Sequence, residues 1–88
     1  MKLSYVRFNP DGDGITALYI DGKLYTSGDY YHNKIDDYLE GFEAGLNYAE
    51  IKFETESFNV DDDKHLFNVP ERLSRVTRLK NCVKNTGS

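Results

Sequence analysis

Carboxylates are the side chains in this sequence whose spacing most suggests chemistry. Four of them fall within residues 36–43, at intervals that place them on one face of a helix: Asp36, Asp37, Glu40 and Glu43. Basic residues four positions after these acids would stabilise such a helix, but the sequence has none there. The face is therefore either solvated surface or an acidic surface that meets a basic one.

Further acids follow this segment. Glu54 and Glu56 lie on the polar side of an alternating stretch, and Asp61, Asp62 and Asp63 are adjacent. The three aspartates match no spacing of a known metal site. They are interpreted as a solvated loop or as an electrostatic contact that mimics the phosphates of nucleic acid.

Catalytic motifs are absent from the sequence. No Ser/His/Asp or Cys/His arrangement can be argued from spacing, and no Walker loop or GxGxxG is present. An EF-hand loop starting at Asp11 would need an oxygen ligand and a glycine where Ile15 and Thr16 stand, so Asp11 and Asp13 are assigned to a turn. We expect a non-enzymatic protein without a metal or a cofactor.

The elements that position these acids predict an α+β fold in a single domain. We expect a small antiparallel sheet of three to four strands, one main amphipathic helix and a short C-terminal helix. The predicted elements are a strand at 2–8, a hairpin at 15–27, a helix at 29–47, a strand at 50–60 and a helix at 70–84. Asp21-Gly22 fits a two-residue type I′ turn, and Asp29 is the predicted N-cap of the main helix.

The main helix has one apolar stripe, formed by Tyr31, Ile35, Tyr38, Leu39, Phe42, Leu46 and Ala49. Such a stripe is typical of a helix that packs on a sheet. Gly41 and Gly45 border it, and each costs roughly 1 kcal/mol in a helix interior. Three explanations are open: close packing on the sheet, close approach of a partner, or an early helix end.

Charge is distributed unevenly along the chain. Residues 1–63 hold fourteen acids and five bases, whereas residues 64–88 hold one acid and six bases. The predicted C-terminal helix could bind nucleic acid or a nucleotide through Arg72, Arg75, Arg78, Lys80 and Lys84. Alternatively, the acidic body of one copy could meet the basic helix of another in a homo-oligomer.

The length of 88 residues, ordinary hydrophobic content and single Cys82 indicate a small globular protein without an internal disulfide. No stretch is long and apolar enough to span a bilayer, and the first residues lack a signal-peptide pattern. We expect no membrane partner and a cytoplasmic location.

Tyrosine is abundant, and Tyr30, Tyr31, Tyr19 and Tyr25 are candidate interface anchors.

The strand–Asp-Gly–strand–helix pattern of residues 15–50, ending in DDYLEGFEAGLNYAE, resembles small phage-encoded proteins and is similar to some type II anti-CRISPR inhibitors. The resemblance is one of overall pattern and transfers no individual residue. It implies an inhibitor that occupies a cationic nucleic-acid groove of a host defence protein, in the host cell cytoplasm, with the acids above supplying the charge.

Overall fold

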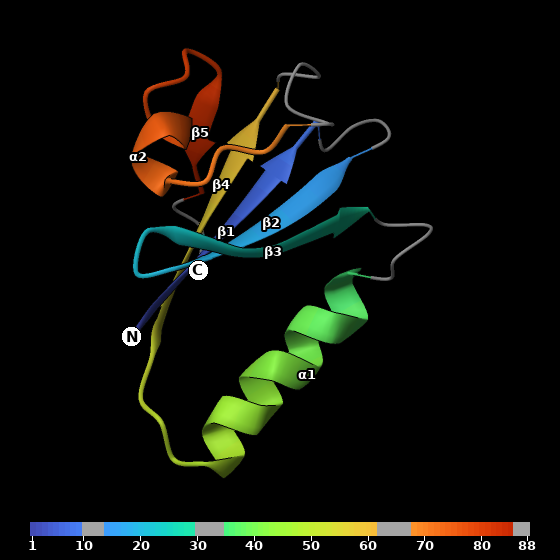
Figure 1. Ribbon diagram of the computed structural model, residues 1–88, viewed down its shortest axis with the longest axis vertical. Helices are drawn as coiled ribbons and strands as arrows, with labels where there is room; N and C mark the ends of the chain where they lie inside the picture. Colours follow the sequence, from blue (N-terminus) through green and yellow to red (C-terminus); the bar gives the residue numbers. More distant parts are fainter. Residues whose placement is uncertain (10–13, 30–34, 62–67, 86–88) are drawn as a thin grey trace.

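The fold is built on a five-stranded mixed sheet with the order β3-β2-β1-β4-β5 (Figure 1). The computed structural model describes residues 1–9, 14–29, 35–61 and 68–85. The strands are β1 (Lys2–Phe8), β2 (Ile15–Ile20), β3 (Lys23–Asp29), β4 (Glu54–Val60) and β5 (Cys82–Lys84), and the helices are α1 (Ile35–Tyr48) and α2 (Leu73–Val76). The predicted α+β class is confirmed, with more strands than expected.

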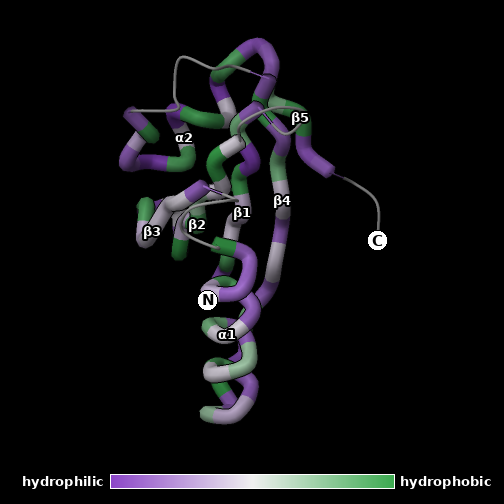
Figure 2. Tube along the Cα trace, turned by 90° about the vertical axis from the view of Figure 1, so that its right-hand side faces the viewer, coloured by the Kyte–Doolittle hydropathy of each residue, from purple (hydrophilic) through white to green (hydrophobic). Residues whose placement is uncertain are grey.

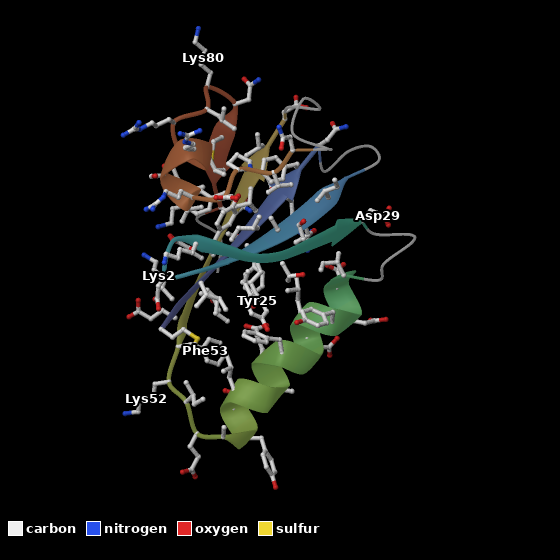
Figure 3. All side chains as sticks on the ribbon, in the orientation of Figure 1. Lys2, Tyr25, Asp29, Lys52, Phe53 and Lys80 are labelled. Atoms are coloured by element: carbon white, nitrogen blue, oxygen red, sulfur yellow. The ribbon has the colours of Figure 1, made fainter. Side chains whose placement is uncertain are left out.

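The hairpin of β2 and β3 forms as predicted around its two-residue turn. Asp21 has a φ of 50° and Gly22 a φ of 87°, the two positive values that a type I′ turn requires. The register shifts between Leu18 and Tyr19, which face Thr26 and Leu24, so Tyr25 is an extra residue in β3. This bulge turns the Tyr25 side chain toward α1 (Figure 3).

The sheet is mixed rather than antiparallel because β4 runs parallel to β1, its neighbour. A helix separates β4 from the hairpin, and a helical crossover returns the chain to the starting end of the sheet. The next strand therefore runs in the same direction as β1. The strand expected at 50–60 begins only at Glu54, where this pairing starts.

The prediction that residue 29 belongs to the main helix is wrong, whereas the residues that an N-cap at Asp29 would serve lie outside the described part of the chain. Asp29 is the last residue of β3 and pairs with Ile15, and the described part of the helix begins at Ile35 rather than at 29. Asp36 and Asp37 lie in the first turn of α1, where carboxylates favour the positive end of the helix dipole. The hydropathy of α1 alternates with each turn, as an amphipathic helix requires (Figure 2).

The prediction of one helix over 70–84 is also wrong. Only the single turn α2 is helical, and residues 82–84 form β5, antiparallel to β4. Without β5, the outer edge of β4 would leave its backbone groups without partners, and Cys82 and Val83 suit a strand. Leu73, Val76 and Leu79 still face the core, as their spacing predicted.

The two faces of the sheet have separate cores. On one face Val6, Phe8, Ala17, Tyr19, Phe58, Val60 and Val76 form a buried cluster, which Leu73, Leu79 and other half-buried residues of the C-terminal segment cover. On the other face Leu3 and Leu18 pack against Ile35, Leu39 and Leu46 of α1. In Figure 1, α1 and α2 accordingly lie on opposite sides of the sheet. No helix among the described residues is both long and apolar enough to cross a membrane.

Candidate functional site

Helix α1 packs mainly against β2 and β3, at one side of its face of the sheet (Figure 1). The neighbouring part of that face, over β1 and β4, borders a groove of about 490 Å³, which we call the α1 groove. Its lining residues are Tyr5, Arg7, Thr16, Asp36, Leu39, Glu40, Glu43, Ser57, Asn59 and Asn85. The groove brings together residues from α1, three strands and the chain after β5.

The helical wall of the α1 groove carries three carboxylates. Asp36, Glu40 and Glu43 are spaced by four and three residues, so they follow one side of the helix. Glu40 is exposed, and Asp36 and Glu43 are half-buried. Asp37 is exposed and does not line the groove. Three of the four acids predicted on this helix therefore share one site.

The floor of the groove is polar and ordered by hydrogen bonds. The Asn85 side-chain amide donates to Ser57 Oγ at 3.1 Å and to Asn59 Oδ1 at 3.3 Å. The Asn85 backbone N–H also donates to the Ser57 carbonyl oxygen at 2.9 Å. These contacts hold Asn85, which follows β5, against Ser57 and Asn59 of β4, so the floor is preorganised for polar groups.

Tyr5 lies at the base of the groove with an unusual hydroxyl. The hydroxyl oxygen is buried and lacks a hydrogen-bond partner that meets the usual distance and angle limits. Burial, followed by the nearby Glu43 carboxylate, raises the pKa of Tyr5 far above its ordinary value. The phenol is therefore neutral at physiological pH and keeps a proton to donate. Arg7 is exposed and adds one positive charge to the lining.

The acids predicted on the following strand do not join the groove. Glu56 lies on the opposite face, where its side chain is only 10% exposed and accepts a hydrogen bond from Ser4 Oγ at 3.1 Å. It also pairs with Lys2 Nζ at 3.4 Å and with Lys84 Nζ at 3.8 Å. Glu56 thus holds β1, β4 and β5 together and is not available to a partner. Glu54 is exposed, beside Lys2 and Lys52.

The remaining predicted acids and anchors are dispersed or undescribed. Asp61 follows β4, where its carbonyl oxygen accepts a hydrogen bond from the Asn81 amide at 3.1 Å. Asp62, Asp63, Tyr30 and Tyr31 lie outside the described residues, as do Asp11 and Asp13. The acidic residues predicted to bind a partner therefore do not form one patch among the described residues.

Aromatic residues flank α1 on the side of β3. The rings of Tyr25 and Phe42 have centroids 5.4 Å apart, and a hydrogen bond with Tyr25 raises the pKa of Tyr38. Tyr25 and Tyr38 are each about half exposed, so they can reach a partner. Tyr19 cannot act as the predicted anchor, because it is fully buried and its hydroxyl donates to the Pro70 carbonyl oxygen at 2.5 Å.

The basic residues lie on the other side of the sheet. Arg72, Arg75, Arg78 and Lys80 are exposed, and we call these four the basic segment. Arg72 and Arg75 line an open hollow of about 680 Å³ with residues 68–71 and Leu79. Lys80 extends away from the body of the molecule (Figure 3). Lys84, predicted with them, is instead paired with Glu56.

Several lining residues of the α1 groove were missed by sequence reasoning. Tyr5 and Arg7 lie on the α1 side of β1, and the alternation of that strand contains the signal, because it places them with Leu3. Ser57, Asn59 and Asn85 gave no signal, since their place depends on the pairing of β1 with β4 and of β4 with β5.

No group of three or more His, Cys, Asp or Glu suited to a metal ion is found within the described ranges. No protein-family model, curated protein or solved structure matches this chain. The arrangement that remains is a polar groove with a carboxylate wall, which can accept cationic and hydrogen-bond-donating groups.

Proposed function

We propose that this chain is a non-enzymatic binding protein, an inhibitor of the kind that phages and mobile elements encode. It blocks a cationic nucleic-acid-binding surface of a host defence protein by inserting the acidic wall of the α1 groove. The observation that carries this proposal is the row formed by Asp36, Glu40 and Glu43, beside a polar groove on a helix that has no base between residues 35 and 48.

The spacing of this row suits a surface that normally binds phosphates. With a rise of about 1.5 Å per residue, Asp36 and Glu40 are about 6 Å apart along the helix axis, and Glu40 and Glu43 about 4.5 Å. One strand of duplex DNA presents a phosphate about every 3.4 Å along its axis. The two charge densities are of the same order. Arginine also binds carboxylates and phosphates with the same two-pronged geometry.

The surroundings of the row support contact beyond charge alone. The amides of Asn59 and Asn85 and the hydroxyl of Ser57 offer acceptors on the floor of the groove. Tyr25 and Tyr38 add exposed ring surface on the other side of α1, on which an arginine or an apolar side chain can rest.

The test begins with affinity capture of the tagged chain from bacterial lysate, with and without nuclease, followed by mass spectrometry. We expect one nucleic-acid-handling protein in both conditions. That protein is then purified, and its binding to a fluorescent DNA oligonucleotide is measured by anisotropy at increasing concentrations of this chain. Displacement of the oligonucleotide is the expected result. Capture without displacement would refute the inhibitory function.

A charge-reversal pair tests the site within the same assay. Glu40→Lys with Glu43→Lys should weaken displacement roughly 10- to 100-fold, because attraction becomes repulsion at the groove. The matched control, Glu50→Lys with Glu54→Lys, makes the same change in net charge at exposed positions outside the groove. Equal losses in the two variants would show that net charge, rather than this groove, governs binding.

A second candidate function is direct binding of nucleic acid by the basic segment. Its four exposed bases lie within nine residues of the C-terminal segment, which covers the face of the sheet opposite α1. Binding of a labelled oligonucleotide by the chain alone, lost with added salt and in an Arg75→Ala/Arg78→Ala variant, would favour this function. No binding at low salt would exclude it.

A further inference from the structure

The two sides of the sheet carry opposite charges that the fold keeps apart. The acidic side of α1 consists of Asp36, Asp37, Glu40 and Glu43, with no base in the helix. On the other side, residues 71–80 hold the four bases of the basic segment and a single acid, Glu71. The ion pairs found in the described part of the chain involve Glu56 and neutralise neither set.

This separation excludes one explanation of the uneven charge of the sequence. A fold could bring an acidic body and a basic terminus together and cancel them within one molecule. Here the sheet lies between them, because α1 packs on the face of Leu3 and Leu18, whereas the C-terminal segment packs on the face of Val6 and Phe8. Both charged surfaces are left without a partner inside the described chain.

We infer that these two surfaces bind each other between molecules: the acidic side of α1 in one copy docks on the basic segment of a second copy. Charge complementarity supports this occupant, since one surface carries four acids, of which Asp37 and Glu40 are exposed and the other two half-buried, and the other surface carries four exposed bases. The inference is independent of the function proposed above. It concerns the same side of α1, so self-association and capture of a basic partner exclude one another there.

Exposed tyrosines on α1, outside the acidic row itself, offer the second copy a further surface to contact. Tyr38 is 49% exposed and Tyr48 is 93% exposed, and both belong to the helix that carries the acids. Arginine guanidinium groups stack on tyrosine rings while pairing with carboxylates. Three of the four residues of the basic segment are arginines, which suits this combination.

The contact is heterologous, because it joins two different surfaces. After one contact forms, the pair still presents a free acidic side at one end and a free basic segment at the other. Such contacts add further copies unless the rotation closes a ring. Each exposed ion pair adds only roughly a twofold to fivefold gain in affinity. We therefore expect weak association that grows with concentration and that salt suppresses.

Sedimentation velocity of nucleic-acid-free protein tests the inference. At about 50 mM salt the average mass should rise above 10.1 kDa as the concentration increases, and at about 500 mM salt it should stay at 10.1 kDa. A protein that sediments as a monomer throughout this range at low salt would overturn it. Association that appears only after a DNA oligonucleotide is added would also overturn it, in favour of nucleic acid on the basic segment.

A charge swap between two variants makes the test specific. Asp37→Lys/Glu40→Lys leaves two acids and two bases on the acidic side, and Arg75→Glu/Arg78→Glu leaves two bases and two acids in the basic segment, so each variant loses the net charge of one surface. Each variant alone should remain monomeric at low salt, whereas an equimolar mixture should form a one-to-one complex, because the unaltered basic segment of one variant meets the unaltered acidic side of the other. Self-association of either variant alone, or a mixture that stays monomeric, would refute pairing between these two surfaces. Circular dichroism confirms that both variants are folded.

Discussion

The two faces of the sheet are covered in different ways. One face is covered by α1, a single regular helix whose apolar stripe is legible in the sequence and whose side borders an open groove. The other face is covered by a segment with one helical turn, several backbone turns and a three-residue strand. The irregular segment covers the more completely buried core, where Val6, Phe8, Tyr19, Val60 and Val76 are fully inaccessible. An irregular segment can therefore bury a core more completely than a regular helix does.

The largest expected effect follows from this difference in burial. Phe8→Ala should lower the free energy of unfolding by about 3–5 kcal/mol, because it leaves a cavity in a fully enclosed core. Leu39→Ala, beside the α1 groove, should cost about 2–3 kcal/mol, since the surroundings can relax toward the groove. Urea unfolding of both variants measures the two costs. A larger loss of unfolding free energy in Leu39→Ala than in Phe8→Ala would show that the core beneath α1 is the more tightly enclosed of the two.

Alkaline pH should weaken the irregular face through Tyr19. Burial raises the pKa of Tyr19 to about 12, whereas an unfolded tyrosine loses its proton near pH 10. Between these values the folded state binds more protons than the unfolded state, so stability falls as pH rises, by about 1–3 kcal/mol. Unfolding measured at pH 9 and at pH 11.5 tests this.

The control for that measurement is Tyr19→Phe, which removes the titrating group and its bond to Pro70. This variant should lose about 1–2 kcal/mol at neutral pH and show a smaller further loss on going to alkaline pH. Tyr5, whose pKa is also raised, contributes in the same direction to both proteins and cancels in the comparison. Equal pH dependence in the two proteins would rule out Tyr19 as a cause of the alkaline loss.

The smallest expected effect is a gain in stability on the regular face. A Cβ added at Gly41 would meet no atom within 4 Å, so the glycine does not serve close packing on the sheet. Gly41→Ala should raise the free energy of unfolding by about 0.5–1 kcal/mol, seen as a higher melting temperature. Gly22→Ala, at a φ of +87°, should instead destabilise the hairpin. A destabilised Gly41→Ala variant would show that the helix packs more tightly at this position.

Local signals in the sequence predicted what local physics determines. The Asp21-Gly22 turn fixes the hairpin, and the spacing of Ile35, Leu39 and Leu46 fixes which side of α1 is buried. The same spacing placed Asp36, Glu40 and Glu43 along one side, so the carboxylate wall of the groove could be predicted. Residues spaced three or four apart lie on the same side of a helix, whatever tertiary contacts the helix makes.

Pairing between distant strands could not be predicted in this way. Residues 82–84 join the sheet because β4 offers a free edge, and nothing within these three residues indicates it. The floor of the groove depends on the same pairing, so Ser57 and Asn85 were missed. Glu56 was misjudged for a related reason. The alternation of residues 50–60 placed Glu56 on a polar side of the strand. The bases that pair with its carboxylate, Lys2 and Lys84, come from opposite ends of the sequence, so the pairing could not be predicted.

The central position of β1 has a consequence for how the chain folds during synthesis. Strand β1 leaves the ribosome before both of its neighbours; it pairs on one side with β2, but its other neighbour is separated from it by 52 residues, as in the Ser4–Glu56 pair. Until β4 has emerged, β1 is an unprotected edge with Val6 and Phe8 uncovered. Such a nascent edge is prone to pair with other chains, and the high contact order of the β1–β4 pairing slows its closure. A chaperone or fast completion of translation would therefore raise the yield of folded protein more than any change within the hairpin.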